Sequence, residues 1–168
     1  MAEEAGLRFP TSAGDSFDVV ERVKGNATTD FGAPGVACKE DEAALTPAKA
    51  TRYATLLRAS WTVFDQVAAA SPASLRKGPR GGGRDRDKMI GHVLDAEVNY
   101  ARTLGVKHKE PAMGDTAAVE ALRSDIEDAL VHPREVSGKV WPPRYAARRI
   151  AWHVLDHAWE MEGRRESE

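Results

Sequence analysis

Apolar residues recur at helical spacing in four stretches of the chain, and each stretch predicts an amphipathic α-helix. Thr46-Pro47 favours a helix start, because the hydroxyl can cap the first turn and the proline lacks an N–H that the first turn does not use. Gly105 is a stop signal for the second helix. The four predicted helices cover about residues 47–70, 85–104, 116–131 and 144–163.

Helices of this length, joined by connections of about ten residues, predict an all-α fold, a four-helix bundle. The last helix carries apolar residues around much of its circumference, so we expect it to be contacted on several sides. The chain is predicted to divide into an N-terminal extension at residues 1–46 and a four-helix bundle domain at residues 47–168.

The extension is rich in Gly, Pro, Thr and Asp and has no helical periodicity. Gly25-Asn26 is a two-residue turn signal, which predicts a short β-hairpin between Val19–Lys24 and Ala27–Phe31. The segment that follows, Asp30–Gly35, is expected to be a loop. It is either a surface arm or a lid over an active site.

The composition of the chain excludes some classes of binding partner. The 168 residues carry a net charge of -2, which lacks the positive excess expected of a nucleic-acid-binding protein. No uncharged stretch of about 18 residues could span a bilayer. Cys38 is the only cysteine, so no intramolecular disulfide can form. We therefore predict a cytoplasmic protein with no nucleic-acid or membrane partner. The basic loop Lys77–Arg84 lacks the Gly-Lys-Ser/Thr of a phosphate-binding loop.

Three histidines are the candidate metal ligands. His153 and His157 are four residues apart on the last helix, so their side chains lie about 40° apart on one face. His92 shares the apolar face of the second helix with Met89 and Val93. If both helices start at the same end of the bundle, the rise per residue places His92 about 12 Å deep and the pair about 15 and 21 Å deep.

Three neutral imidazoles suit Zn, Ni, Cu or Fe(II) and leave one position open for water or substrate. A zincin would need Glu where Val154 stands, and a di-iron bundle would need Glu at Met89, Ile150 or Val154. The alternative is three separate core histidines. His108 and His132 lie in polar loops and are expected at the surface.

The stretch from Met89 to Glu97, with His92 inside it, and the last-helix His153-x-x-x-His157 together resemble the DinB/YfiT-like family of metalloenzymes, over about residues 47–165. The resemblance implies a four-helix bundle in which the three histidines bind a divalent metal, often Zn or Ni, with water completing the shell. It also implies a transferase or isomerase that uses a low-molecular-weight thiol such as mycothiol or bacillithiol.

Charged residues near the histidines are further candidates. Asp156 and Glu160 flank the pair and are interpreted as catalytic residues that orient an imidazole or relay a proton, or as solvent-facing charges. Arg144 and Arg148, with Arg149, are expected at the same end of the bundle as the Arg80–Arg86 loop. There they would bind an anionic cofactor or substrate, or simply aid solubility.

The resulting hypothesis is a mononuclear metal-dependent thiol S-transferase or isomerase acting on a small-molecule electrophile. The alternatives are a metal-dependent hydrolase and a non-catalytic, stress-related metal-binding bundle. A homodimer is expected from the resemblance, and Trp61 is interpreted as an exposed aromatic residue, either at a dimer surface or under the extension.

Overall fold

A computed structural model describes residues 2–78, 82–134 and 140–165. Within these residues the chain is all-helical, with four α-helices, two 3-10 helices and no strand. The elements, in chain order, are η1 (Thr29–Phe31), η2 (Lys39–Glu42), α1 (Pro47–Ala69), α2 (Arg86–Arg102), α3 (Thr116–Val131) and α4 (Pro143–Gly163). The predicted helices are therefore confirmed to within a few residues at each end.

Side-chain caps fix two of the helix starts. Thr46 accepts a hydrogen bond from the backbone N–H of Lys49 at 3.3 Å, and Pro47 occupies the first position of α1. Asp115 accepts from the backbone N–H of Ala118 at 3.0 Å and caps α3. Each cap satisfies a backbone donor that has no partner inside the first helical turn.

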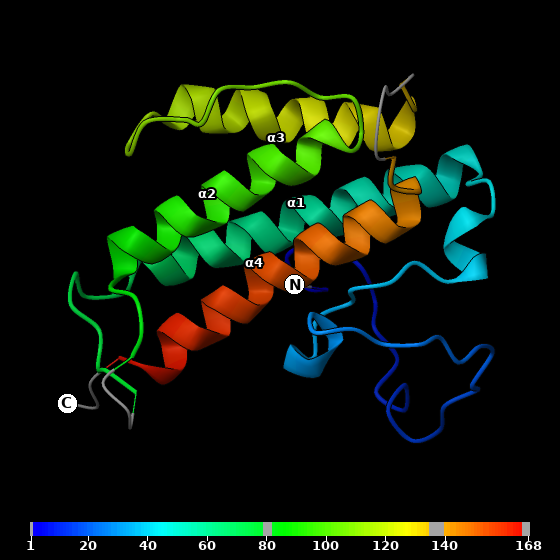
Figure 1. The fold of residues 1–168 in the computed structure, drawn as a ribbon, viewed down its shortest axis with the longest axis horizontal. Helices are drawn as coiled ribbons and strands as arrows, with labels where there is room; N and C mark the ends of the chain where they lie inside the picture. The colour runs from blue at the N-terminus through cyan, green and yellow to red at the C-terminus, as the bar shows by residue number, and fades with distance from the viewer. Residues whose placement is uncertain (1, 79–81, 135–139, 166–168) are drawn as a thin grey trace.

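The four helices pack as a bundle in which α1 and α4 run in one direction and α2 and α3 run in the other (Figure 1). Residues 105–115 return along the length of α3 before it begins, which allows α2 and α3 to run in parallel (Figure 1). The direction of α4 relative to α2 is fixed at both ends. Trp141 donates its backbone N–H to Thr103 after α2, and Arg76, before α2, donates to Arg164 after α4.

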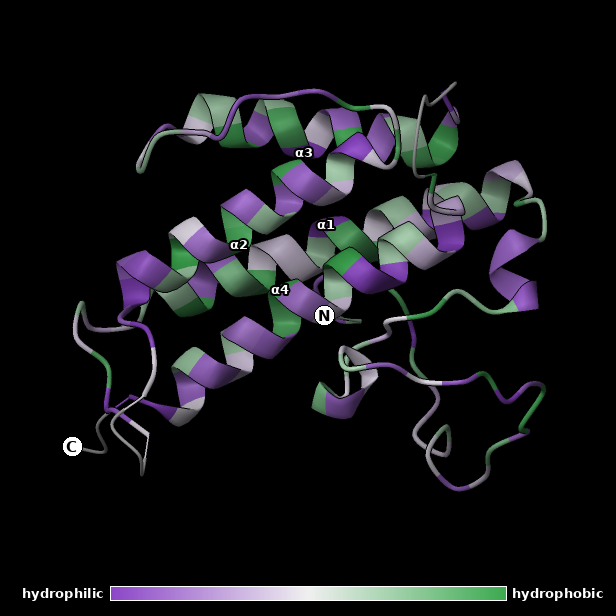
Figure 2. Cartoon of the chain, in the orientation of Figure 1, coloured by the Kyte–Doolittle hydropathy of each residue, from purple (hydrophilic) through white to green (hydrophobic). Residues whose placement is uncertain are grey.

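The core lies between the helices and is built from their apolar faces (Figure 2). Helix α4 contacts α1, α2, α3 and η2, as its apolar circumference predicts. Burying a large aliphatic or aromatic side chain contributes about 1.5–3 kcal/mol, so these residues dominate stability. The largest fully buried side chains include Leu57, Trp61, Phe64, Met89, Leu122, Ile126, Leu130, Ile150 and Met161.

The prediction of an exposed Trp61 is wrong, because only 1% of the residue is exposed. Its ring packs in the core with the guanidinium groups of Arg58 and Arg123 over it, at 5.5 and 5.3 Å from the ring centroid. Trp61 therefore lends no support to a dimer surface, and the homodimer stays a prediction.

The predicted β-hairpin in the extension is not formed. Asn26 starts a compact turn instead, because its side-chain oxygen accepts the backbone N–H groups of Thr28 and Thr29. The hydroxyl of Thr29 in turn accepts the Asn26 N–H at 2.8 Å. Asparagine side chains that bond two or three residues ahead favour a turn over an extended strand, and η1 follows directly.

The extension is held against α4 by three side chains of that helix. Tyr145 donates its hydroxyl to the carbonyl oxygen of Pro34 at 2.8 Å. Arg144 pairs with Glu40, and Arg148 pairs with the buried Asp41 in η2. None of the helices in the described part of the chain is long and apolar enough to cross a membrane.

Candidate metal centre

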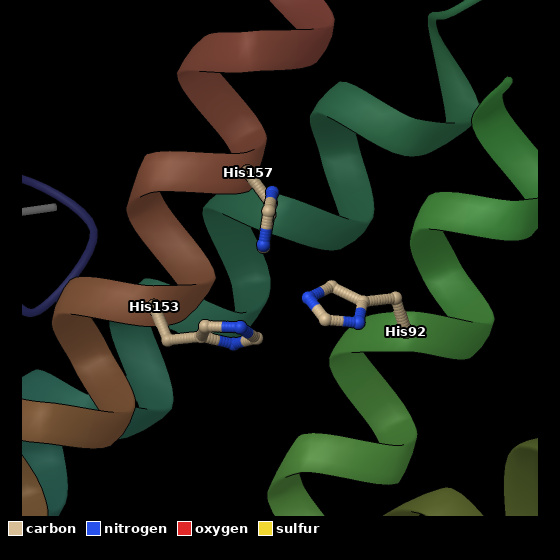
Figure 3. Close-up of side chains that lie close together, drawn as sticks. All are labelled: His92, His153 and His157. Carbon is tan, nitrogen blue, oxygen red and sulfur yellow. The ribbon is translucent and has the colours of Figure 1, made fainter. Parts of the chain in front are cut away.

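His92 on α2 and His153 and His157 on α4 point toward one another across the bundle (Figure 3). Their ring centroids are 4.6 to 5.1 Å apart. One ring nitrogen from each residue lies within 4.8 Å of the other two. The three candidate ligands are thus brought to one point, as the sequence predicts.

Helices α2 and α4 begin at opposite ends of the bundle, not at the same end as the predicted depths of the histidines require. The histidines nevertheless lie at one level. His92 lies six residues after the start of α2, and His157 lies six residues before Gly163, the end of α4. At about 1.5 Å per residue, both lie about 9 Å from the same end of the bundle.

The hydrogen bonds of the imidazoles differ from those of ordinary core histidines. His157 donates its Nδ1–H to Glu160 at 3.0 Å. Neither His92 nor His153 has a hydrogen-bond partner among the described residues, and the Nδ1 of His153 is fully buried. Buried polar atoms are normally hydrogen-bonded, so these free nitrogens need another partner. A metal ion would be one.

Glu160 is itself held in place by a second charge. Its other carboxylate oxygen lies 2.9 Å from the Nη2 of Arg164. The Arg164 guanidinium lies directly over Gly83, where a Cβ atom would come within 1.5 Å of its Nη1. Gly83 also has a φ of 125°, which side chains disfavour. The loop before α2 therefore supports the orientation of His157 through Arg164 and Glu160.

The surroundings keep two of the imidazoles neutral. Burial, followed by the charges of the nearby His157, His92 and Arg149, lowers the pKa of His153 to about 3. Burial, followed by the charge of Arg84, lowers the pKa of His92. A neutral imidazole has a free electron pair on one nitrogen, which is the form that binds a metal.

The donor set fits a divalent cation. Tetrahedral zinc ligands lie about 2.0–2.1 Å from the ion and hence about 3.3 Å from one another. The histidine nitrogens lie within 4.8 Å of one another, so small ring movements close the difference. The three histidines could hold one metal ion, and their chemistry favours Zn, Ni, Cu or Fe(II) over Mg or Ca.

A pocket of about 560 Å³ opens beside the three histidines. Its lining includes Trp152 and Asp156 from α4, and Thr28 and Phe31 from η1 and its neighbours. The extension is therefore part of the pocket wall, and Asp30–Gly35, interpreted from the sequence as either a surface arm or a lid, contributes Phe31 and Ala33 to it.

Arg144 and Arg148 are not among the residues that line this pocket. They lie at the start of α4 and pair with Glu40 and Asp41, whereas the loop before α2 lies beside the end of α4. The prediction that they share one end of the bundle with that loop is wrong, because α2 and α4 are antiparallel. Arg80 lies outside the described residues.

Two arginines that do line the pocket, Arg84 and Arg149, were predicted only as members of larger basic clusters. The spacing of Arg149 to His153 is four residues, which would have placed both on one face of α4. No spacing in the sequence indicates that Thr28 and Phe31 line the pocket. His108 pairs with Asp125 and His132 with Asp128, away from the centre.

The site combines a helical bundle with a three-histidine cluster beside a pocket. Comparisons of the chain with protein-family models, with curated proteins and with solved structures found no match. The resemblance to the DinB/YfiT-like family therefore stays a prediction.

Proposed function

We propose that the protein is a mononuclear metal-dependent enzyme that transfers a small thiol to an electrophile, or isomerises a substrate through such a thiol. One observation supports metal binding. Three imidazoles converge, and two of them have no hydrogen-bond partner among the described residues. The pocket beside them favours catalysis over a purely structural metal site, since structural sites are closed. The thiol rests on the DinB/YfiT-like resemblance.

In this proposal His92, His153 and His157 hold Zn or Ni. A divalent cation in that position supplies a Lewis acid that favours the deprotonated form of a thiol or of water. Glu160 fixes the ring of His157, as carboxylates commonly do for metal-binding histidines. Asp156 is the carboxylate that lines the pocket, and it accepts the proton that the thiol releases. The sulfur then forms a bond to the electrophilic carbon, and either a leaving group departs with its bonding electron pair or a double bond opens and its far atom takes up a proton.

Metal binding is tested first, by elemental analysis and calorimetric titration with Zn and Ni. We expect about one tightly held ion per chain, because the site offers one set of three ligands. His153→Ala should lose the ion. His132→Ala is the matched control and should keep it, because His132 lies at the surface beside Asp128. A wild-type protein with native helical circular dichroism that binds neither metal would refute the proposal.

Catalysis is tested with monochlorobimane and a panel of thiols: mycothiol, bacillithiol, cysteine and glutathione. In the expected reaction the thiol loses its proton, its sulfur bonds to the bimane carbon and chloride leaves. Fluorescence should rise only with metal and thiol both present, and much less with His153→Ala. Ester or amide hydrolysis without thiol would instead support the hydrolase. Metal binding that raises the melting temperature without any turnover would support the non-catalytic bundle.

A further inference from the structure

Arg149 differs in its ion pairs from the arginines beside it on α4 and from Arg164, which follows that helix. Arg144 and Arg148 each pair with a carboxylate of η2, and Arg164 pairs with Glu160. Arg149 has no ion-pair partner among the described residues, and its Nη1 is fully buried without a hydrogen bond. A charged guanidinium nitrogen that is removed from water and left without a partner is costly, although the Arg149 side chain as a whole is only half-buried. Such a group is therefore a candidate for binding an anion.

Aromatic rings hold this guanidinium in place. Its central carbon lies 5.5 Å from the ring centroid of Tyr100 and 5.3 Å from that of Trp152. Both distances fall within the range of cation–π contacts. The side chain is thus oriented before any ligand arrives, and little conformational entropy is lost when its donors are used.

A second cation lies in the same pocket. Arg84, just before α2, lines the pocket together with Arg149. The three histidines line the same pocket, so both charges lie beside the histidine centre. Asp156 is the one acidic side chain among the lining residues. Before a metal ion binds, two cations and one carboxylate leave a net charge of one, which favours a monoanion over a dianion.

The rest of the lining suits an apolar group. Trp152 on α4 and Phe31, Ala27 and Ala33 in the extension contribute carbon surface, and the volume of about 560 Å³ is in the range of small-molecule sites. A ligand with an anionic group at Arg149 and an apolar body beneath η1 would use both parts of the wall. Its body would lie beside the three histidines.

We propose that this pocket binds small monocarboxylic acids, with the carboxylate on the planar fork of Arg149, Arg84 adding long-range attraction, and the apolar body between Phe31 and Trp152. This inference deepens the proposed function and rests on it for the role of the ligand as substrate. It names the substrate class: an electrophile, or a thiol, that carries one carboxylate.

The test uses butyrate and its neutral analogue butyramide as probes, titrated into the metal-free and the zinc-loaded protein and followed by amide chemical shifts in NMR. We expect butyrate to bind at least about tenfold more tightly than butyramide in both forms, since a charge-assisted hydrogen-bonded pair is lost with the amide. The shifts should centre on α4 and on residues 27–33.

Arg149→Gln should lower the affinity for butyrate at least about tenfold and leave the affinity for butyramide unchanged. Arg149→Lys keeps the charge without the fork and should fall between the two. Arg102→Gln is the matched control, because it removes one charge at the far end of α2, where Arg102 hydrogen-bonds to Asn99 and does not line the pocket. This control should bind butyrate like the wild type. Circular dichroism checks the fold of each variant.

The inference is overturned if Arg149→Gln binds butyrate as tightly as the wild type, or if butyrate and butyramide bind alike. If butyrate binds only in the presence of zinc and binds equally well to Arg149→Gln, its carboxylate contacts the metal alone. That result would also overturn the inference. The zinc titration of the same samples separates this result from failure of the proposed function. If the protein binds butyrate through Arg149 but binds no metal, the proposed metal-dependent enzyme is refuted and the proposed carboxylate site is retained.

Discussion

Glu97 is buried on α2, away from the histidine centre, and its ionisation should control how stability depends on pH. Its Oε2 lies 3.4 Å from the Nε of Arg123, and its Oε1 has no hydrogen-bond partner among the described residues. Arg123 makes its shorter contact with Asp65, at 2.7 Å. Burial therefore dominates and raises the pKa of Glu97 to about 7, although Arg123 and Trp61 favour the charged form.

The direction of the effect follows from where the proton is bound. The reference pKa of the carboxyl group is 4.5, so between that value and about 7 the folded state keeps a proton that the unfolded state has lost. Stability from this group is complete below pH 4.5, falls as the pH rises, and is constant again above about pH 7. At about 1.4 kcal/mol per pH unit, the total loss is about 3 kcal/mol.

Glu97→Gln removes this dependence, because glutamine stays neutral and has nearly the same shape. Urea denaturation of the wild type and the variant at about pH 5 and pH 8 measures the difference. We expect the variant to gain about 2–3 kcal/mol relative to the wild type between the two conditions. Glu110→Gln, at an exposed position, is the matched control and should show no such gain.

An unchanged difference at both pH values would refute the reasoning. It would mean that Arg123 keeps Glu97 ionised throughout, and that the pair outweighs the cost of burial. A change of opposite sign would mean that the carboxylate is stabilised in the fold and that its pKa lies below 4.5.

Three further predictions address the metal centre, the extension and the core. Glu160→Gln should weaken zinc binding about 10- to 100-fold in calorimetry, because the carboxylate that orients His157 loses its charge. Asp41→Asn keeps an acceptor for the N–H of Cys38 but loses the charge paired with Arg148. It should cost about 1–2 kcal/mol and speed proteolysis of the extension, whereas an unchanged cleavage rate would show that this pair does not hold it. Ile150→Ala, at a fully buried position, should cost about 2–5 kcal/mol in denaturant unfolding. A cost below 1 kcal/mol would contradict the packing described for α4.

The helices were predictable because their signals are local. Thr46-Pro47 and Asp115 act as start signals whatever the rest of the chain does, and the apolar spacing identifies the inward face of each helix. The histidine cluster was predictable for a related reason. His153 and His157 share a face by spacing alone, and an inward His92 near mid-helix can reach them whether its helix runs parallel or antiparallel to α4.

Helix direction and the packing of the extension were not predictable in this way. The relative direction of α2 and α4 depends on residues 105–115, which run back along the length of α3, and no local pattern specifies this path. Gly25-Asn26 is a turn signal that fits a hairpin and an Asn-initiated turn equally well, and the side chain of Thr29 decides between them. Trp61 was predicted to be exposed, and no local pattern shows that it packs in the core with Arg58 and Arg123 over its ring.

The arginines of α4 show why a cluster in sequence need not be one site in space. Arg144 and Arg148 are four residues apart and therefore share a face, which η2 covers with Glu40 and Asp41. Arg149 is the next residue, but one step along a helix turns the side chain by about 100° and carries it to the histidine face. The first two arginines hold the extension in place and the third lines the pocket that the extension covers. A substitution that breaks an ion pair between η2 and α4 should therefore alter ligand binding at Arg149, although no residue that lines the pocket is replaced.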